Sequence, residues 1–365
     1  MIQRRLMQLI CDRRNALLIA IVALFLSGMG CAIDASPKDD AYHYMANGVD
    51  DQLYNEWWYF DVADNDTQFQ VVYLLSDPDN ISSERKIQVQ AVAMQDGLPN
   101  IIGQHQSLGY GGDRKSPMFD IDKSGFSTEE EPNLQVWGEV LDNATGDPIR
   151  WDLVYQPTAR PWFAIPVQEH IGHLKGDWIK WLVYMPSAQV TGTLTIGNRT
   201  KSLQGIGFHE HAWGRFALSD PQITRASVSV PLEGFSLAFA EILGEQRVAF
   251  LGIEKDGKSI VFSDKQIKLN YSNAFYNMTA EIYPAAYHVE ADNGDYTLDL
   301  AVDVQKSAAT ALDYQPPLPS VLIFHQVSIL QGTLESKSGE KFSFQKQGFS
   351  GFTAARQNKK KSGGS

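Results

Sequence analysis

The stretch "GIGFHEHAWG", residues 205–214, combines two histidines, a carboxylate and a tryptophan between glycines. Successive side chains of a β-strand point to opposite faces, so an extended conformation divides this group in two. One face carries both histidines and the tryptophan (His209, His211 and Trp213), and the other carries the carboxylate between two apolar residues (Phe208, Glu210 and Ala212). Glu210 therefore points away from His211, and a carboxylate that pairs with this histidine must come from another strand.

A metal site is one interpretation of the two histidines. A His-x-His pair can bind a metal ion, and His170 or His173 would supply a third ligand. No carboxylate on the same strand completes the set, and the surrounding tryptophan and glycines are not typical of a metal site. We therefore predict no metal ligands here.

Proton transfer is a second interpretation. His211 would donate or accept a proton beside an aromatic wall, with a carboxylate that orients the ring. Glu241 is the best candidate for that carboxylate, because a charged side chain within the apolar segment 239–241 is costly unless it is paired. A third interpretation is structural: the histidine and the tryptophan are satisfied by backbone hydrogen bonds where two barrels meet.

A second aromatic motif, "NEWWYFD", occupies residues 55–61. On a strand, Glu56, Trp58 and Phe60 face one way and the remaining residues face the other, so both faces are largely aromatic. The motif predicts either a strand buried on both sides or one wall of an apolar ligand cavity inside a barrel, with Glu56 as a buried acid. In the second case we expect ligand contacts from both motifs and from the strand around Glu241: Glu56, Trp57, Trp58, Tyr59, Phe208, His209 and Phe239.

The rest of the chain is typical of an all-β protein. Short segments rich in β-branched and aromatic residues recur, among them residues 69–75, 86–92, 134–140 and 190–196. Asp-Gly and Asn-Gly pairs between such segments indicate hairpins. We predict two antiparallel β-barrel domains packed together. The boundaries are a leader at 1–31, a linker at 32–50, barrels at 51–214 and 215–352, and a flexible basic tail at 353–365.

Composition excludes several classes of function. The formal net charge of −12 over 365 residues leaves no basic stripe for nucleic acid. The two cysteines, Cys11 and Cys31, lie in or beside the leader, so the body of the protein has no thiol chemistry, disulfide or cysteine-ligated zinc. The sequence has neither a Gly-x-Ser-x-Gly elbow nor a nucleotide-binding glycine loop, and it implies no cofactor.

The amino terminus predicts export. Four arginines precede an apolar run at residues 16–26, which is followed by small residues and Cys31. We expect a periplasmic, cell-surface or secreted protein, with lipid attachment at Cys31 or an uncleaved anchor as alternatives that bring it to a membrane. Asn-x-Ser/Thr acceptors fit glycosylation of an exported protein: Asn65, Asn80, Asn143, Asn198, Asn270 and Asn277.

The two motifs, together with the segment "WLVYMPSAQVTGTLTIGNRTKSLQGIGFHEHAWG" that leads into the first, resemble the lipocalin-like AttH/carotenoid 1,2-hydratase family. The family signature is Gly-x-Gly-Tyr-x-Asp-His-Asn-Trp-Gly, and the resemblance covers most of residues 50–350. Matching positions are Gly205, Gly207, His211, Trp213 and Gly214, and the departures are Phe208 for Tyr, Glu210 for Asp and Ala212 for Asn. The resemblance implies two lipocalin-like barrels with a ligand site near the central motif.

The same resemblance implies chemistry on apolar substrates. Family members include hydratases of polyene and prenyl double bonds and fungal pericyclases. The catalytic His and Trp of the hydratases fall on His211 and Trp213, and a later Tyr-x-Asp pair falls on Phe239 and Glu241, where the acid is kept and the hydroxyl is lost. We therefore expect Glu241 and His211 to protonate an alkene of an isoprenoid or polyene, and Trp213 to stabilise the carbocation. A non-enzymatic carrier of a hydrophobic ligand and a pericyclase are the alternatives.

Overall fold

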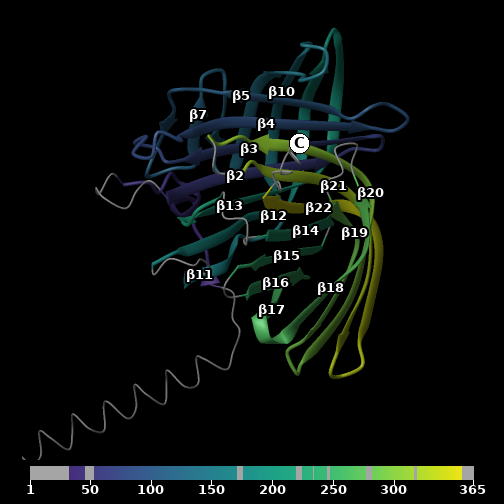
Figure 1. Cartoon of the computed structure of the whole chain (residues 1–365). Helices are drawn as coiled ribbons and strands as arrows, with labels where there is room; N and C mark the ends of the chain where they lie inside the picture. Colours follow the sequence, from purple (N-terminus) through teal and green to yellow (C-terminus); the bar gives the residue numbers. More distant parts are fainter. Residues whose placement is uncertain are drawn as a thin grey trace, which may run out of the picture.

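The computed structural model describes residues 33–45, 53–170, 176–218, 224–232, 234–244, 247–276, 282–315 and 319–355. These residues form two antiparallel sheets, each strongly curled (Figure 1). The expected pair of lipocalin-like barrels is confirmed. The predicted leader, with Cys11, Cys31 and its lipid attachment, lies outside the described residues, and export stays a prediction.

The first sheet contains β1 to β13. Its strands are β1 (Ile33–Asp34), β2 (Tyr54–Ala63), β3 (Thr67–Ser76), β4 (Lys86–Gln95), β5 (Ile101–Gln106), β6 (Gly111–Gly112), β7 (Met118–Ile121), β8 (Ser124–Glu130), β9 (Asn133–Leu141), β10 (Pro148–Pro157), β11 (Trp162–His170), β12 (Trp178–Ile196) and β13 (Arg199–Arg215). The order along the sheet is β5-β4-β3-β2-β13-β12-β10-β9-β8-β7-β6, with β11 on β12 and β1 on β11. The aromatic motif on β2 and the histidine motif on β13 are therefore hydrogen-bonded neighbours.

The second sheet contains β14 to β22. Its strands are β14 (Thr224–Leu232), β15 (Phe235–Leu243), β16 (Arg247–Lys255), β17 (Lys258–Phe262), β18 (Ile267–Tyr276), β19 (Ile282–Asp292), β20 (Tyr296–Leu312), β21 (Val321–Ser336) and β22 (Lys341–Ala355). The order is β17-β16-β15-β14-β22-β21-β20-β19-β18. Two 3-10 helices, η1 (Pro37–Asp40) and η3 (Asp264–Gln266), accompany the sheets. The chain changes sheet between Arg215 and Thr224, and β22 extends to Ala355, into the segment expected as a tail.

Alternation of side chains explains how these strands fold into curled sheets. β9 alternates buried and partly exposed residues along its length, as a strand with one face on a core should. β3, by contrast, is buried on both faces. Its inner face packs inside the first barrel, and its outer face turns towards the second sheet, which explains why every residue of this strand is buried.

The described residues form four apolar cores. One fills the first barrel, a second fills the concavity of the second sheet, and a third and a smaller fourth lie between the two sheets. The third core combines Trp57 and Phe208 of the first sheet with Ala240 and Val321 of the second. In this way β2 and β13 bury both of their faces, one in a barrel and the other against the neighbouring sheet.

The segment at residues 33–45 corrects the expected linker. β1 pairs with β11, and the side chains of Asp40, Ala41 and Tyr44 are buried against the first barrel. Trp58 donates its indole N–H to the carbonyl of Asp40 over 3.2 Å. This polar, irregular segment reads as a linker because its apolar residues are few, yet it supplies essential contacts to the interior of the barrel.

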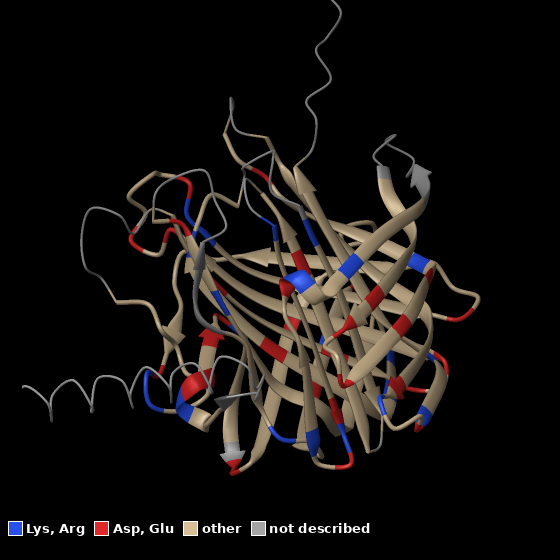
Figure 2. Cartoon of the chain, turned by 90° about the horizontal axis from the view of Figure 1, so that it is seen from below, with Lys and Arg blue, Asp and Glu red and all other residues tan. Residues whose placement is uncertain are grey.

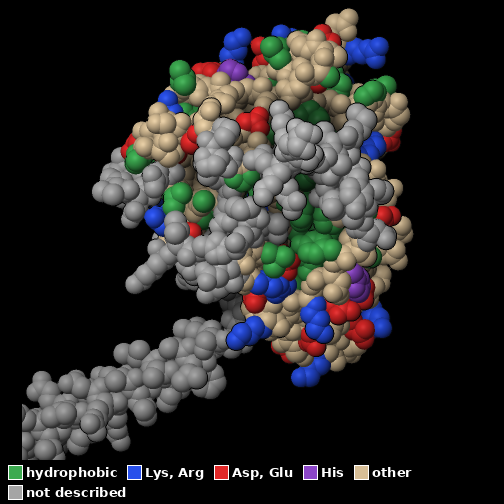
Figure 3. Space-filling model, in the orientation of Figure 1, with side chains coloured by type: hydrophobic (Ala, Val, Ile, Leu, Met, Phe, Trp, Pro, Cys, Tyr) green, Lys and Arg blue, Asp and Glu red, His purple; other side chains and the backbone are tan. Residues whose placement is uncertain are grey.

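Charged side chains of both signs are interspersed over the strand ends and loops (Figure 2). On the face drawn in Figure 3, hydrophobic side chains gather in the middle of the molecule and charged ones towards its lower end and its upper edge. Within the described residues, no helix has the length and apolar character needed to cross a membrane.

Candidate functional site

The histidine motif lies inside the first barrel. β13 pairs with β2 in a register that places Trp213 opposite Glu56, His211 opposite Trp58 and His209 opposite Phe60. Residues that are directly opposite in an antiparallel pair share a face, so all six side chains point to the same interior. The division of the motif into two faces, which alternation predicts, is therefore correct.

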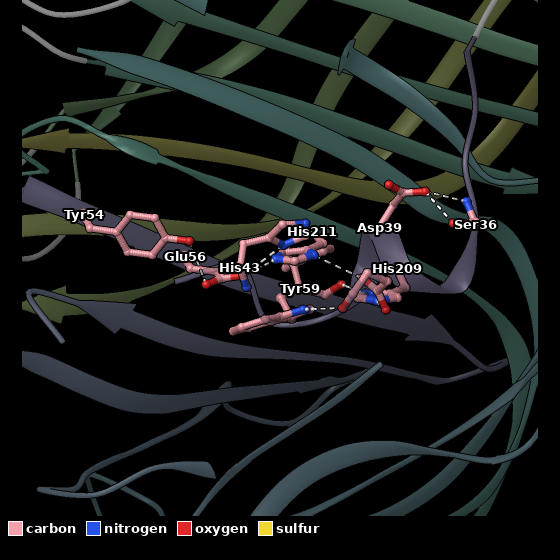
Figure 4. A network of polar contacts seen from close by, with 10 residues as sticks. Ser36, Asp39, His43, Tyr54, Glu56, Tyr59, His209 and His211 are labelled. Atoms are coloured by element: carbon pink, nitrogen blue, oxygen red, sulfur yellow. Dashed lines mark hydrogen bonds and ion pairs between the residues drawn. The ribbon is translucent and has the colours of Figure 1, made fainter. Parts of the chain in front are cut away.

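Glu56 is the centre of a buried polar network (Figure 4). Its Oε1 lies 2.9 Å from His211 Nε2 and accepts the backbone N–H of His43 at 2.9 Å. Its Oε2 accepts the Tyr54 hydroxyl at 2.8 Å and the backbone N–H of Tyr44 at 3.3 Å. Four hydrogen bonds to one fully buried carboxylate explain how the apolar barrel tolerates this charge.

Asp40 is the second carboxylate of the network. Its Oδ2 lies 3.0 Å from His209 Nε2, and its Oδ1 lies 3.4 Å from His211 Nδ1. The other ring nitrogen of His209 donates to the Tyr59 carbonyl at 2.9 Å. Asp40 lies in η1, and its contacts with these two histidines hold the polar amino-terminal segment against the interior of the first barrel.

The network fixes the charge of its members. Burial alone would raise the pKa of Glu56, but the contacts with His211 and His43 outweigh it and hold this pKa below the usual range. Asp40 behaves in the same way beside His209 and His211. For His211, burial would lower the pKa, whereas the carboxylates of Asp40 and Glu56 raise it overall. A positive imidazolium held between two carboxylates is therefore the favoured state.

Aromatic rings enclose the imidazoles. His43 stacks on Trp213 with ring centroids 3.9 Å apart, His211 stacks on Trp58 at 4.5 Å, and His209 stacks on Phe60 at 3.8 Å. Such packing orients the rings and keeps water from them. The indole of Trp213, expected to stabilise a carbocation, is covered by His43.

The expected pairing of His211 with Glu241 is wrong. Glu241 lies on β15 of the second sheet, where it accepts from Arg247 Nε at 2.6 Å and from the Tyr271 hydroxyl at 3.0 Å. The carboxylates at His211 are instead Glu56 and Asp40. Glu241 does have the charged partner that its apolar surroundings require, and this partner is an arginine on the adjacent strand β16. His211 and Trp213 face one core and Glu241 another, so the three do not form a common site.

A cavity lies on the opposite faces of β2 and β13, between the two sheets. Its space, including the open mouth, is about 1130 Å³. The second sheet contributes lining residues from β14, β15, β20, β21 and β22, and the segment after β13 contributes Phe216 and Leu218. Lining residues from the first sheet are Trp57, Tyr59, Gln70, Val72, Leu74, Phe208 and Glu210. The lining of the cavity is mostly apolar, as in sites that bind small organic ligands.

Three of the predicted ligand contacts line this cavity, namely Trp57, Tyr59 and Phe208. Four do not. Glu56, Trp58 and His209 point into the first barrel, whose interior is filled by side chains, and Phe239 belongs to the core of the second sheet. The two motifs therefore lie on strands whose outer faces line a cavity, and this cavity lies between the sheets and not inside a barrel.

Asp61 is the residue that sequence reasoning missed. It is fully buried on β2, and its Oδ2 accepts the Ser229 hydroxyl from β14 at 3.0 Å. The cavity is lined by three neighbours of Asp61, namely Ser229, Tyr59 and Gln70, the last of which is directly opposite Asp61 on β3. Burial raises the pKa of Asp61 well above its usual range, and the nearby Glu210 carboxylate adds to this, although hydrogen bonds from Ser229 and Tyr59 oppose it. The alternation Trp57-x-Tyr59-x-Asp61 is visible in the sequence and was the available signal.

Further polar groups lie along the cavity. Glu210 binds Arg225 at 2.6 Å and accepts the indole N–H of Trp181 at 2.7 Å. The Arg225 guanidinium lies 5.1 Å from the ring centroid of Trp57. On the second sheet, burial lowers the pKa of His325 to about 4, so this histidine is neutral near pH 7.

Comparisons with known proteins agree with this architecture. No family model and no curated protein matches the sequence. Among solved structures, a Nitrosomonas europaea protein described as AttH matches with a TM-score of 0.63 at 14% identity. The match covers 90% of this chain and 98% of that one. CghA in complex with Sch210972 matches with a TM-score of 0.57 at 12% identity, covering 89% and 97% of the two chains.

Kievitone hydratase from Nectria haematococca also matches, with a TM-score of 0.57 at 12% identity over 86% of this chain and 93% of that one. Identities this low establish the architecture and not the reaction. The resemblance to the lipocalin-like AttH and hydratase family that the motifs indicate is thus confirmed, at the level of the fold.

Proposed function

We propose that this protein binds an apolar isoprenoid or polyene in the cavity between its sheets and catalyses acid-dependent hydration or cyclisation of a carbon–carbon double bond. The observation that supports this most strongly is Asp61, a buried carboxyl with a raised pKa whose hydrogen-bond partner Ser229 lines the aromatic cavity. A carboxylic acid that stays protonated near pH 7 can donate a proton. Two of the similar structures also suit this role, one being a hydratase and the other a complex with a small molecule.

The proposed reaction needs no cofactor, because the proton that Asp61 gives up is returned to it at the end. Asp61 transfers its proton through the hydroxyl of Tyr59 or Ser229, both of which line the cavity, to one alkene carbon, which leaves a carbocation at the other. In hydration, water adds to that carbon and returns a proton to the Asp61 carboxylate. In cyclisation, a second double bond attacks the cation, and loss of a proton to the same carboxylate ends the sequence.

Aromatic faces stabilise the cation in this scheme. Trp57, Tyr59 and Phe208 form the wall beside Asp61. The contact between Arg225 and Trp57 shows that the indole face already accepts a positive charge. This replaces the role that the sequence suggested for Trp213.

Filling the cavity tests the binding part of the proposal. Ser227 lines the cavity from β14, directly opposite Gly351 of β22. In Ser227→Phe the added ring occupies ligand space, so we expect the affinity for parinaric acid, a fluorescent linear polyene, to fall at least about tenfold. A fluorescence titration measures this.

Thr193→Phe is the matched control, because Thr193 is exposed on β12 away from the cavity. It should bind the probe like the wild-type protein. Equal affinity in Ser227→Phe and wild type would show that the ligand site lies elsewhere.

A further inference from the structure

We infer that His43, Glu56 and His211 form a binding site for a divalent transition metal of the zinc type. One ligand atom from each of the three residues lies within 4.8 Å of both others. Glu56 Oε1 is 3.3 Å from His43 Nδ1 and 2.9 Å from His211 Nε2. Ligand atoms around tetrahedral zinc are separated by roughly 3.3 Å, given metal–ligand bonds of about 2.0–2.1 Å. Small side-chain movements therefore bring all three atoms to bonding distance.

The donor set suits this class of metal. Two imidazoles and one carboxylate form a set that zinc uses when it keeps a fourth position for water or another ligand. The set was not visible in the sequence, because it combines one histidine of the His-x-His motif with residues about 155 and 168 positions earlier in the chain. His209, the other histidine of the motif, is not part of it.

Asp40 supplies an independent indication. In metal sites, the ring nitrogen that does not bind the metal usually faces a carboxylate, which orients the imidazole. His211 Nδ1 lies 3.4 Å from Asp40 Oδ1, on the side of the ring away from Glu56. Both atoms are buried, and neither has a well-formed hydrogen bond. Asp40 is itself oriented by a hydrogen bond with His209, so the carboxylate that faces His211 is also held in place.

Charge and packing favour a cation at this place. Among the described residues, the ion-pair partners of the buried carboxylates Asp40 and Glu56 are histidines alone. A divalent ion would displace the Nε2 proton of His211 and offset both negative charges in its place. The stacking of His43 on Trp213 and of His211 on Trp58 already fixes both imidazole planes.

A metal bound at this site would have a structural role, which is separate from the chemistry proposed for the cavity. His43 belongs to the amino-terminal segment, Glu56 to β2 and His211 to β13. A bound metal would join these three segments and hold residues 33–45 in the barrel. The metal lies on the opposite face of β2 and β13 from the proposed ligand cavity, so the two proposals stand or fall independently.

Metal titration tests this inference. The full chain, freed of metal with a chelator, is titrated with Zn²⁺ by calorimetry and with Co²⁺ by visible absorption. We expect one ion per chain and a higher thermal midpoint with metal. His43→Gln should weaken Zn²⁺ binding at least about 100-fold, and Asp40→Asn about 10–100-fold. The His43 side chain is partly exposed, and Glu56 is bonded by the backbone N–H of this residue, which any substitution retains.

His288→Gln is the matched control. His288, Glu290 and Asp299 form a similar triad on β19 and β20, but that triad is largely exposed. This variant should bind Zn²⁺ as the wild type does. The inference is overturned if wild-type protein binds Zn²⁺ no more tightly than His43→Gln, or if His288→Gln abolishes binding.

Discussion

Asp61→Asn should lower turnover of a polyene or prenylated substrate by about 10²–10⁴-fold, the usual contribution of a general acid. Asparagine has nearly the same shape and still accepts the hydrogen bond from Ser229, so the fold and the cavity should persist. The loss should appear in kcat, while the affinity for parinaric acid stays within about twofold of wild type. The assay uses a linear carotenoid, a prenylated phenol and a polyene, with product analysis of each.

Asp152→Asn is the control for this substitution, because Asp152 is an exposed aspartate on β10 that bonds Gln135. It should retain full turnover. If Asp61→Asn turns over substrate like the wild type, Asp61 is not the acid. Binding without turnover in all three proteins would instead identify a carrier.

Glu56→Ala should lower the free energy of unfolding by about 3–5 kcal/mol, as expected when one partner of a buried ionic network is removed. The change leaves His211, the Tyr54 hydroxyl and two backbone N–H groups without their acceptor inside the barrel. Urea denaturation followed by tryptophan fluorescence measures the loss. Should this variant fail to fold, Glu56→Gln keeps the shape and should show a smaller loss in the same direction.

An exposed carboxylate provides the comparison. Glu139 forms surface ion pairs with Arg150 and Lys123, and Glu139→Ala should cost at most about 1 kcal/mol. A loss below about 1 kcal/mol for Glu56→Ala as well would contradict the account of the network.

Much of the architecture was predictable because alternation along a strand is a local property. The order of residues 205–214 alone placed His209, His211 and Trp213 on one face and Phe208 and Glu210 on the other, and both sets are found there. Recurrent short strands with hairpin turns likewise indicated two barrels. These inferences need no knowledge of which strands pair.

The site was less predictable because it depends on contacts between distant segments. Glu56 and His211 are 155 residues apart, and their contact follows from the register of β2 and β13, which one sequence does not reveal. Asp40 and His43 lie in a polar segment that lacks any strand pattern. Alternation also cannot tell whether a face turns into a barrel or towards a second sheet, which is why the ligand contacts were divided between the two faces.

The most direct test of the proposed chemistry is the protonation state of Asp61. Carbon-13 NMR of labelled aspartate carboxyls, assigned by comparison with Asp61→Asn, follows this group through a pH titration. Because burial outweighs the hydrogen bonds from Ser229 and Tyr59, the pKa should be raised, with the carboxyl still protonated at pH 7 and its signal shifted by a polyene ligand. An ionised Asp61 at pH 7, with a pKa near the ordinary value of about 3.9, would contradict the proposal that it donates the proton.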